Sequence, residues 1–307
     1  MATPVVTLPA RSTTSPTRAV VDLVRLARPG QWAKNILVIP LAVLDAPVWR
    51  WGMIGQLLWA IAAFTLGSAV IYVINDIADR ERDRRHAVKR ERPIAAGRIS
   101  LGFAWVYAAA LTAGLAALLV GRPIAAWWPI PVYLALNFAY SYRLKHVPLI
   151  DVLVVAAGFV LRLWQGHLAI GATHSDWLMI TVFSVCVLLS LGKRRHELVV
   201  SGSQHRPALR GYSVQLADHL ILLTAALTIA SYLFFISTLA SVGSYAGLAT
   251  LISTPCAFFA LFRYLQTVMV DEGGGNPVRV LLRDRTMLAN SLVWLAVLSA
   301  VLITAHA

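Results

Sequence analysis

Long apolar runs separated by short charged segments dominate this chain. Nine of the runs are near the length that a bilayer core requires of a helix, and none alternates apolar and polar residues as a strand would. We therefore predict an all-α polytopic membrane protein with nine transmembrane helices. The predicted spans cover residues 33–48, 54–75, 101–120, 124–142, 149–170, 177–192, 217–240, 245–266 and 286–305.

The segment before the first span has a different composition. Residues 1–19 are rich in Ser, Thr and Pro with scattered Arg, which predicts a disordered cytoplasmic arm without the apolar core of a cleaved signal peptide. Residues 20–27 have the pattern of a short amphipathic helix on the membrane surface. We predict that residues 20–307 form a single transmembrane catalytic domain.

Composition supports the membrane assignment. The 307 residues are 58% hydrophobic and 13% charged, with a mean hydropathy of +0.69. A soluble domain has nearly twice that share of charged residues, so this class is excluded. Cys186 and Cys256 both lie in apolar runs and are predicted to act as small hydrophobic residues rather than a disulfide or a metal site.

The chain is strongly basic, with a formal net charge of +13. Nine spans place alternate loops on opposite sides of the membrane, and 24 of the 27 Lys and Arg residues then fall on one side. Positively charged loops stay in the cytoplasm, so the N-terminus and the charged motifs are predicted to face the cytoplasm of a plasma-membrane protein. Membrane topology and phosphate binding explain the charge better than a nucleic-acid partner.

A carboxylate motif follows the second span directly. Asn75 precedes Asp76, Asp79 and Asp83, and a helix would place the three carboxylates on one face. Hard oxygen ligands at this density suit Mg²⁺ that bridges to a diphosphate. The alternative is a solvated helix end, because arginines are interleaved with the carboxylates; ionisable groups at a membrane boundary favour the functional interpretation.

Basic residues recur in other segments on the same predicted side. Lys34 and Asn35 begin the first span shortly after Gln31, where a helix N-terminus favours anions. The alternative there is a lysine that snorkels beside an interfacial Trp. Further phosphate-binding candidates, or ordinary positive-inside residues, are Lys89, Arg92, Tyr142 and Lys145.

Ionisable residues also lie within or at the end of later spans. Asp151 and Arg162 are about three helical turns apart and are predicted to face one cavity, with a purely structural pair as the alternative. Lys193, Arg194 and Glu197 follow the sixth span and place one carboxylate among several cations. No second His completes a zinc motif, and Gly273–Gly275 lacks the residues of a phosphate loop and is predicted to be a flexible turn.

The motif Asn-Asp-x-x-Asp-x-x-x-Asp formed by Asn75, Asp76, Asp79 and Asp83 resembles that of the UbiA-type intramembrane prenyltransferase superfamily. The resemblance covers nearly the whole chain after the N-terminal arm. It implies a nine-helix bundle with a cytoplasmic active site in which these carboxylates bind a diphosphate through Mg²⁺. Most members carry a second acidic motif after the sixth span, where this chain instead has Lys193, Arg194, Arg195 and Glu197.

Within the superfamily, the segments 28–35, 89–97, 192–198 and 282–285 are similar to the branch that transfers phosphoribose to a polyprenyl (decaprenyl) phosphate for cell-wall arabinan synthesis. That branch implies phosphoribosyl pyrophosphate as the donor. The number of phosphate groups to be bound agrees with this donor, because a phosphate beyond the metal-bound diphosphate can be held by cationic side chains without a second metal ion. The predicted catalytic metal ligands are Asp76, Asp79 and Asp83; the predicted substrate-binding residues are Gln31, Lys34, Asn35, Asn75, Lys89, Arg92, Tyr142, Lys145, Asp151, Arg162, Lys193, Arg194 and Glu197.

Two other functions are compatible with parts of the pattern. A prenyltransferase for an aromatic or quinone-precursor acceptor shares the first acidic motif, but the missing second motif counts against it. A transporter would explain ionisable residues within spans, but a dense acidic motif on one side only disfavours it. Lipid chain length, a paralogous acceptor and a possible homo-oligomer stay open.

Overall fold

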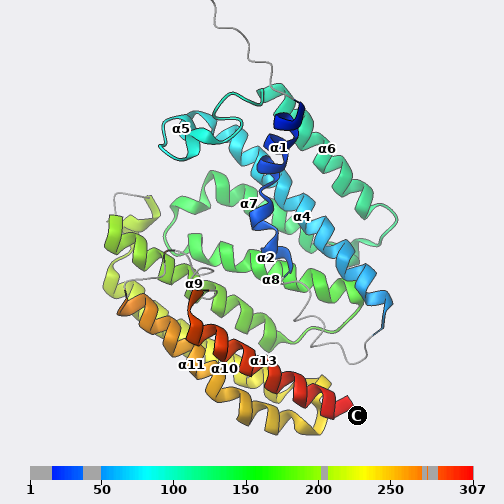
Figure 1. Ribbon diagram of the computed structural model, residues 1–307, viewed down its shortest axis with the longest axis vertical. Helices are drawn as coiled ribbons and strands as arrows, with labels where there is room; N and C mark the ends of the chain where they lie inside the picture. The colour runs from blue at the N-terminus through cyan, green and yellow to red at the C-terminus, as the bar shows by residue number, and fades with distance from the viewer. Residues whose placement is uncertain (1–15, 37–49, 202–206, 272–274, 276–282, 307) are drawn as a thin grey trace, which may run out of the picture. The chain divides into compact units, whose positions relative to one another are not determined.

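A computed structural model describes residues 16–36, 50–201, 207–271, 275 and 283–306, and all regular structure in this part of the chain is helical (Figure 1). This confirms the predicted all-α class. The α-helices are α1 (Pro16–Ala27), α2 (Ala33–Ile36), α4 (Gly52–Ala78), α5 (Arg80–Arg84), α6 (Leu101–Leu119), α7 (Pro129–Tyr142), α8 (Ile150–Ile170), α9 (Asp176–Ser201), α10 (Val214–Ser237), α11 (Ala246–Met269) and α13 (Arg285–His306).

Seven helices of the described residues are long and apolar enough to cross a membrane. They correspond to seven of the nine predicted spans. The predicted span 124–142 is not one continuous helix. The short 3₁₀-helix Ile124–Ala126 comes first, and α7 begins at Pro129 and has 14 residues. Proline favours the first turn of a helix, so Pro129 sets this late start. The predicted span 33–48 contains α2, and its remainder lies outside the described residues.

Two boundaries differ from the prediction. Helix α1 begins at Pro16, so the last residues assigned to the disordered arm are helical. Helix α9 continues to Ser201, nine residues beyond the predicted end at residue 192. The extension is stabilised by side-chain pairing, because Arg194 donates to Asp151 and Arg195 donates to Asp218. The predicted glycine turn 273–275 falls mostly outside the described residues.

The chain divides into two compact units, and helix α4 contributes residues to both. The first unit comprises Met1–Ala33 and Thr65–Ala117. Its core is formed by α1, the end of α4, α6 and the segment before α6, through Leu26, Val73, Ile94, Ile99, Ala104 and Ala108. Burial of this apolar set fixes α1 against the end of α4, where the carboxylate motif begins.

The second unit comprises Lys34–Phe64 and Leu118–Ala307. Helix α9 packs against α8 and α10, and α13 lies beside α11, as the orange and red ribbons show (Figure 1). One core cluster includes Val152, Leu188, Leu191, Ile221 and Tyr264. A second cluster farther along the same helices is centred on buried side chains that include Leu163, Tyr232 and Phe235.

The contact between α9 and α11 depends on Gly192. A Cβ added at Gly192 would overlap the Tyr264 hydroxyl and lie 3.2 Å from Val268 Cγ2, and both neighbours are buried. We expect Gly192→Ala to destabilise the fold by about 1–3 kcal/mol, because a packed core resists added volume. Thermal unfolding in detergent measures this change. Gly102→Ala is the control because its Cβ would meet nothing within 4 Å; equal unfolding temperatures for the two variants would contradict the packing argument.

Candidate active site

The predicted carboxylate motif lies where α4 gives way to α5. Asp79 has backbone angles outside the helical region, but its N–H still donates to the Asn75 carbonyl and its carbonyl accepts from the Asp83 N–H, both at 2.8 Å. The helical path is therefore nearly continuous through the motif. Asp76 and Asp83 are buried at 3% and 2% exposure, whereas the Asp79 side chain is about one third exposed.

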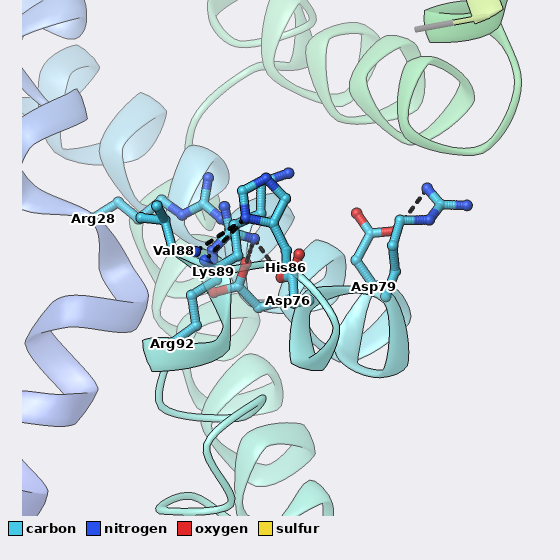
Figure 2. A network of polar contacts seen from close by, with 9 residues as sticks. Arg28, Asp76, Asp79, His86, Val88, Lys89 and Arg92 are labelled. Atoms are coloured by element: carbon cyan, nitrogen blue, oxygen red, sulfur yellow. Dashed lines mark hydrogen bonds and ion pairs between the residues drawn. The ribbon is translucent and has the colours of Figure 1, made fainter. Parts of the chain in front are cut away.

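Two arginines bind the buried carboxylates. Arg28 Nη2 donates to Asp76 Oδ1 at 2.5 Å, and Arg92 Nη1 donates to both Asp76 Oδ1 at 3.0 Å and Asp83 Oδ2 at 2.6 Å. Figure 2 shows Arg28, Asp76 and Arg92 together, with Asp79 apart from them. Asp79 Oδ1 instead lies 3.7 Å from Arg82 Nη1. The structure thus brings two of the three predicted carboxylates together through one guanidinium.

Local structure positions the first arginine. Arg28 follows α1 with a positive φ of 52°, caps the 3₁₀-helix Pro29–Gln31, and places its guanidinium 4.9 Å from the centre of the Tyr72 ring. Sequence reasoning did not assign Arg28 to the site. Arg28 is 48 residues from Asp76 in the sequence, so spacing alone does not predict their contact. Its position between an amphipathic helix and a Pro-Gly pair is the feature that could have marked Arg28 as a site residue.

The second arginine is held by the segment that follows α5. Arg84 Nε donates to the Ala95 carbonyl at 3.1 Å, and Ile94 is buried in the core of the first unit. His86 Nδ1 accepts the backbone N–H groups of Val88 and Lys89 (Figure 2). These contacts fold the chain back so that Arg92 reaches the carboxylates. His86 was also absent from the predicted site residues.

The donor chemistry of this cluster fits a hard divalent cation. Asp76 Oδ1 and Asp83 Oδ2 both contact one cationic nitrogen, Arg92 Nη1, so their negative charges already converge on a single positive group. Mg²⁺ is usually held by one or two carboxylates, with phosphate and water oxygens completing its ligands. Among the described residues no group of three or more His, Cys, Asp or Glu side chains is gathered for a metal. Two carboxylates in this arrangement suit an ion whose remaining ligands come from phosphate and water oxygens.

A buried cation occupies the second unit. Arg162 on α8 is 6% exposed, and its guanidinium donates to Asn35 Oδ1 at 2.8 Å, the Gly158 carbonyl at 2.7 Å and Tyr133 Oη at 2.8 Å. The ring of Tyr133 also lies 4.6 Å from the guanidinium carbon. All three acceptors are neutral, so the hydrogen bonds hold the group in place without cancelling its charge.

Two lysines add to this positive charge. Lys34 is half-buried on α2 next to Asn35, whose Oδ1 accepts from Arg162 Nε, and both Arg162 and Lys193 are near enough to repel its charge. Lys193 Nζ is 4.0 Å from Glu197 Oε1, the limit of an ion pair. Like charges brought together at low dielectric repel one another, so this cationic cluster (Lys34, Arg162 and Lys193) favours a bound anion.

Asp151 and Arg162, which the sequence predicts to face one cavity, have different hydrogen-bond partners, so the alternative of a structural pair between them is not what the described contacts show. Asp151 is fully buried and accepts from Arg194 Nε at 2.7 Å and from Tyr212 Oη at 2.9 Å. Arg194 Nη1 also donates to Glu197 Oε2 at 2.5 Å. Asp151 on α8 therefore pairs with a residue of α9 across the interface of the two helices. Arg194 thus pairs with two carboxylates, Asp151 and Glu197.

Tyr212 is a further residue that sequence reasoning missed. Its hydroxyl accepts the Leu149 N–H at 2.9 Å, where Leu149 has a positive φ of 66° at the start of α8. Burial and the Asp151 carboxylate raise the pKa of the Tyr212 hydroxyl, which keeps it a donor. Gly211 leaves space for Pro148, since a Cβ there would overlap the proline ring. In the sequence, the adjacent Gly211 and Tyr212 are the feature that could have pointed to this contact.

The remaining predicted site residues have varied surroundings. Lys89 is exposed on the 3₁₀-helix Lys89–Glu91, and Tyr142 is exposed with its ring 4.5 Å from that of Phe138. Gln31, Asn75 and Lys145 are half-buried. The structure therefore gathers predicted residues into three groups: the buried carboxylates Asp76 and Asp83 in the first unit, and the cationic cluster and the Asp151–Arg194–Glu197 network in the second.

The fold and the charged clusters define a multi-pass helical membrane enzyme. The family model described as the UbiA prenyltransferase family matches residues 36–276, and this chain belongs to that family. It is 32% identical over 280 residues to the decaprenyl-phosphate phosphoribosyltransferase of Corynebacterium glutamicum, covering 89% of this chain and 84% of the relative. The enzyme of the same name from Mycobacterium tuberculosis is 31% identical, with 94% and 96% covered.

Solved structures support the fold. A UbiA homologue from Archaeoglobus fulgidus bound to DMAPP and Mg²⁺ superimposes with a TM-score of 0.68 at 18% identity, covering 92% of this chain and 99% of the homologue. The predicted family and the predicted helical membrane architecture are both confirmed. The chain is a transferase of this family.

Proposed function

We propose that this protein transfers the 5-phosphoribosyl group from phosphoribosyl pyrophosphate to a polyprenyl phosphate, such as decaprenyl phosphate, and releases pyrophosphate for a cell-wall arabinan precursor. The observation that carries the proposal is the buried Arg162 guanidinium, which three neutral acceptors hold within the cationic cluster of Lys34, Arg162 and Lys193. Such a cluster suits a phosphate beyond the diphosphate of the donor. Relatives named for this reaction, at about 31% identity over nearly the whole chain, support it.

The buried carboxylates serve the pyrophosphate end of the donor. Asp76 and Asp83 would hold Mg²⁺, and Asp79 is the third predicted ligand. Bound there, the ion would neutralise charge on the leaving pyrophosphate. Arg28 and Arg92 present guanidinium donors beside the same carboxylates and would donate to pyrophosphate oxygens as the bond to ribose C1 breaks.

The acceptor needs little activation. A phosphate monoester oxygen is already ionised near neutral pH, so its attack on ribose C1 requires no strong general base. The new C1–O bond forms on the face opposite the departing pyrophosphate. The cationic cluster would bind a phosphate of the donor or the acceptor. The Asp151–Arg194–Glu197 network holds in place the turn of α9 that carries Lys193.

Location follows from the substrates. Phosphoribosyl pyrophosphate is water-soluble and made inside the cell, so the proposal places the charged clusters on the cytoplasmic side of the plasma membrane, as the distribution of Lys and Arg predicts. The lipid acceptor enters from the bilayer. A homo-oligomer stays a prediction.

The test uses purified protein in detergent with Mg²⁺, labelled phosphoribosyl pyrophosphate and decaprenyl phosphate. We expect label to enter the lipid phase and EDTA to prevent this. Activity only with a prenyl diphosphate and an aromatic acceptor would replace the proposal with the general prenyltransferase reaction. Flux of substrate across a vesicle membrane without chemical change would instead indicate a transporter.

Arg162 gives a sharper test of the phosphate site. We expect Arg162→Met to lower kcat/KM for phosphoribosyl pyrophosphate or the lipid phosphate by about a hundredfold or more, because a fixed cation is lost. Arg162→Lys keeps the charge but cannot satisfy Asn35, Gly158 and Tyr133 together, so an intermediate loss is expected.

Initial rates with each substrate varied in turn measure the effect. Exposed Arg122→Met is the control, and thermal unfolding of each variant separates lost binding from lost structure. A folded Arg162→Met protein with unchanged kcat/KM for both substrates would remove Arg162 from the site.

A further inference from the structure

Helix α1 has an exposed apolar face that the proposed reaction does not use. Val20, Val21 and Val24 are 60%, 44% and 47% exposed, although Leu26 on the same helix is fully buried. With about 3.6 residues per turn, the valines lie on the side of the helix away from Asp22 and Leu26. One side of α1 therefore packs into the first unit, and a separate apolar surface stays exposed on the described chain.

Positive charge lies along one edge of this surface. Arg18 and Arg25 are seven residues apart, which places both exposed side chains on the same flank of the valines. Arg25 Nη1 is 3.8 Å from Asp22 Oδ1, but Arg98 donates two hydrogen bonds to that carboxylate, at 2.8 and 3.2 Å. Because Arg98 already neutralises Asp22, the arginine edge stays available for an anion. Valines flanked by arginines match a helix at an anionic membrane surface.

The anchoring of α1 is linked directly to the carboxylates. Helix α1 ends at Ala27, and the next residue is Arg28, whose Nη2 contacts Asp76 Oδ1. Leu26 belongs to the same core cluster as Val73, which lies three residues before Asp76 on α4. Because α1 packs on α4 through this core, the seating of α1 determines where Arg28 lies relative to Asp76.

We propose that the valine and arginine surface of α1 (Arg18, Val20, Val21, Val24 and Arg25) binds the headgroup region of an anionic bilayer, and that this docking sets the position of Arg28 at Asp76. The placement of the Arg28 guanidinium then responds to lipid charge. The argument for docking uses only the exposed surface of α1. The effect of docking on turnover rests on the proposed function.

Docking is tested on the full chain in lipid nanodiscs. An environment-sensitive fluorophore is attached at Val21→Cys after Cys186 and Cys256 are replaced by alanine. We compare phosphatidylcholine alone with a mixture containing about one third phosphatidylglycerol. In the anionic bilayer we expect blue-shifted emission and several-fold weaker quenching by iodide.

Arg18→Gln with Arg25→Gln should weaken this lipid dependence, roughly fivefold for each arginine removed. The matched control is Arg50→Gln with Arg210→Gln, which removes two exposed arginines from other segments. Water-like emission in both bilayers would overturn the proposal. Equal protection in the neutral and the anionic bilayer would also overturn it, because lipid charge would then have no part in the docking.

Turnover supplies the second readout. Wild-type transfer should rise several-fold in the anionic bilayer, and the Arg18→Gln, Arg25→Gln variant should lose that rise while keeping its rate in neutral lipid. Docking without any lipid dependence of turnover would overturn the link to Arg28. Absence of transfer in every lipid would count against the proposed function, and the fluorophore would still decide whether α1 docks.

Discussion

Asp76→Asn and Asp83→Asn are each expected to reduce phosphoribosyl transfer by at least about a thousandfold while the protein stays folded. Asparagine keeps the shape of the side chain and one acceptor oxygen, so Arg92 retains a partner at each position. What disappears is the negative charge that a hard cation requires. The loss should therefore fall on turnover rather than on folding.

Asp79→Asn is expected to have a smaller effect, about tenfold to a hundredfold, because Asp79 is partly exposed and lies near Arg82 instead of Arg92. Asp176→Asn, at an exposed carboxylate at the start of α9, is the neutral control. Initial rates across a Mg²⁺ titration, with thermal unfolding of each variant, distinguish the cases. Wild-type turnover in purified Asp76→Asn or Asp83→Asn would remove the metal assignment.

The sequence predicted the membrane helices well because bilayer thickness imposes one requirement, a long apolar run, on each span. The exception shows the limit of that argument. Residues 124–142 are apolar enough to suggest one span, but Pro129 starts α7 late and a 3₁₀-helix takes the residues before it. Average hydropathy does not register such a backbone restriction.

Charged partners were harder to predict than charged positions. The motif spacing identified Asp76 and Asp83, yet their contact with Arg92 depends on how the loop after α5 folds back through Ile94 and Ala95. Spacing along α8 predicted that Asp151 and Arg162 face one cavity, but it could not predict that Arg194 approaches Asp151 from α9. Helical periodicity predicts which residues share a face but not which helix that face meets.

Among the described ion pairs, we expect the loss of the Asp151–Arg194 contact to lower the free energy of unfolding the most. Both groups are almost completely inaccessible, at 0% and 4% exposure. Arg194→Met leaves the Asp151 anion buried with the Tyr212 hydroxyl as its remaining described partner, and we expect a loss of about 3–5 kcal/mol. Asp151→Asn is expected to cost less, because Asn can still accept hydrogen bonds and Glu197 still neutralises Arg194.

The double variant Asp151→Asn, Arg194→Met completes the cycle. Removing both charges relieves the unpaired anion, so its loss should be clearly smaller than the sum of the two single losses, by about 1–3 kcal/mol. Tyr212→Phe removes a neutral donor from the same carboxylate and should cost only about 1–2 kcal/mol. Unfolding in mixed micelles measures all four variants. Additive losses would mean that Asp151 and Arg194 are not coupled, and the network would then lose its proposed role of holding α9 and Lys193 in place.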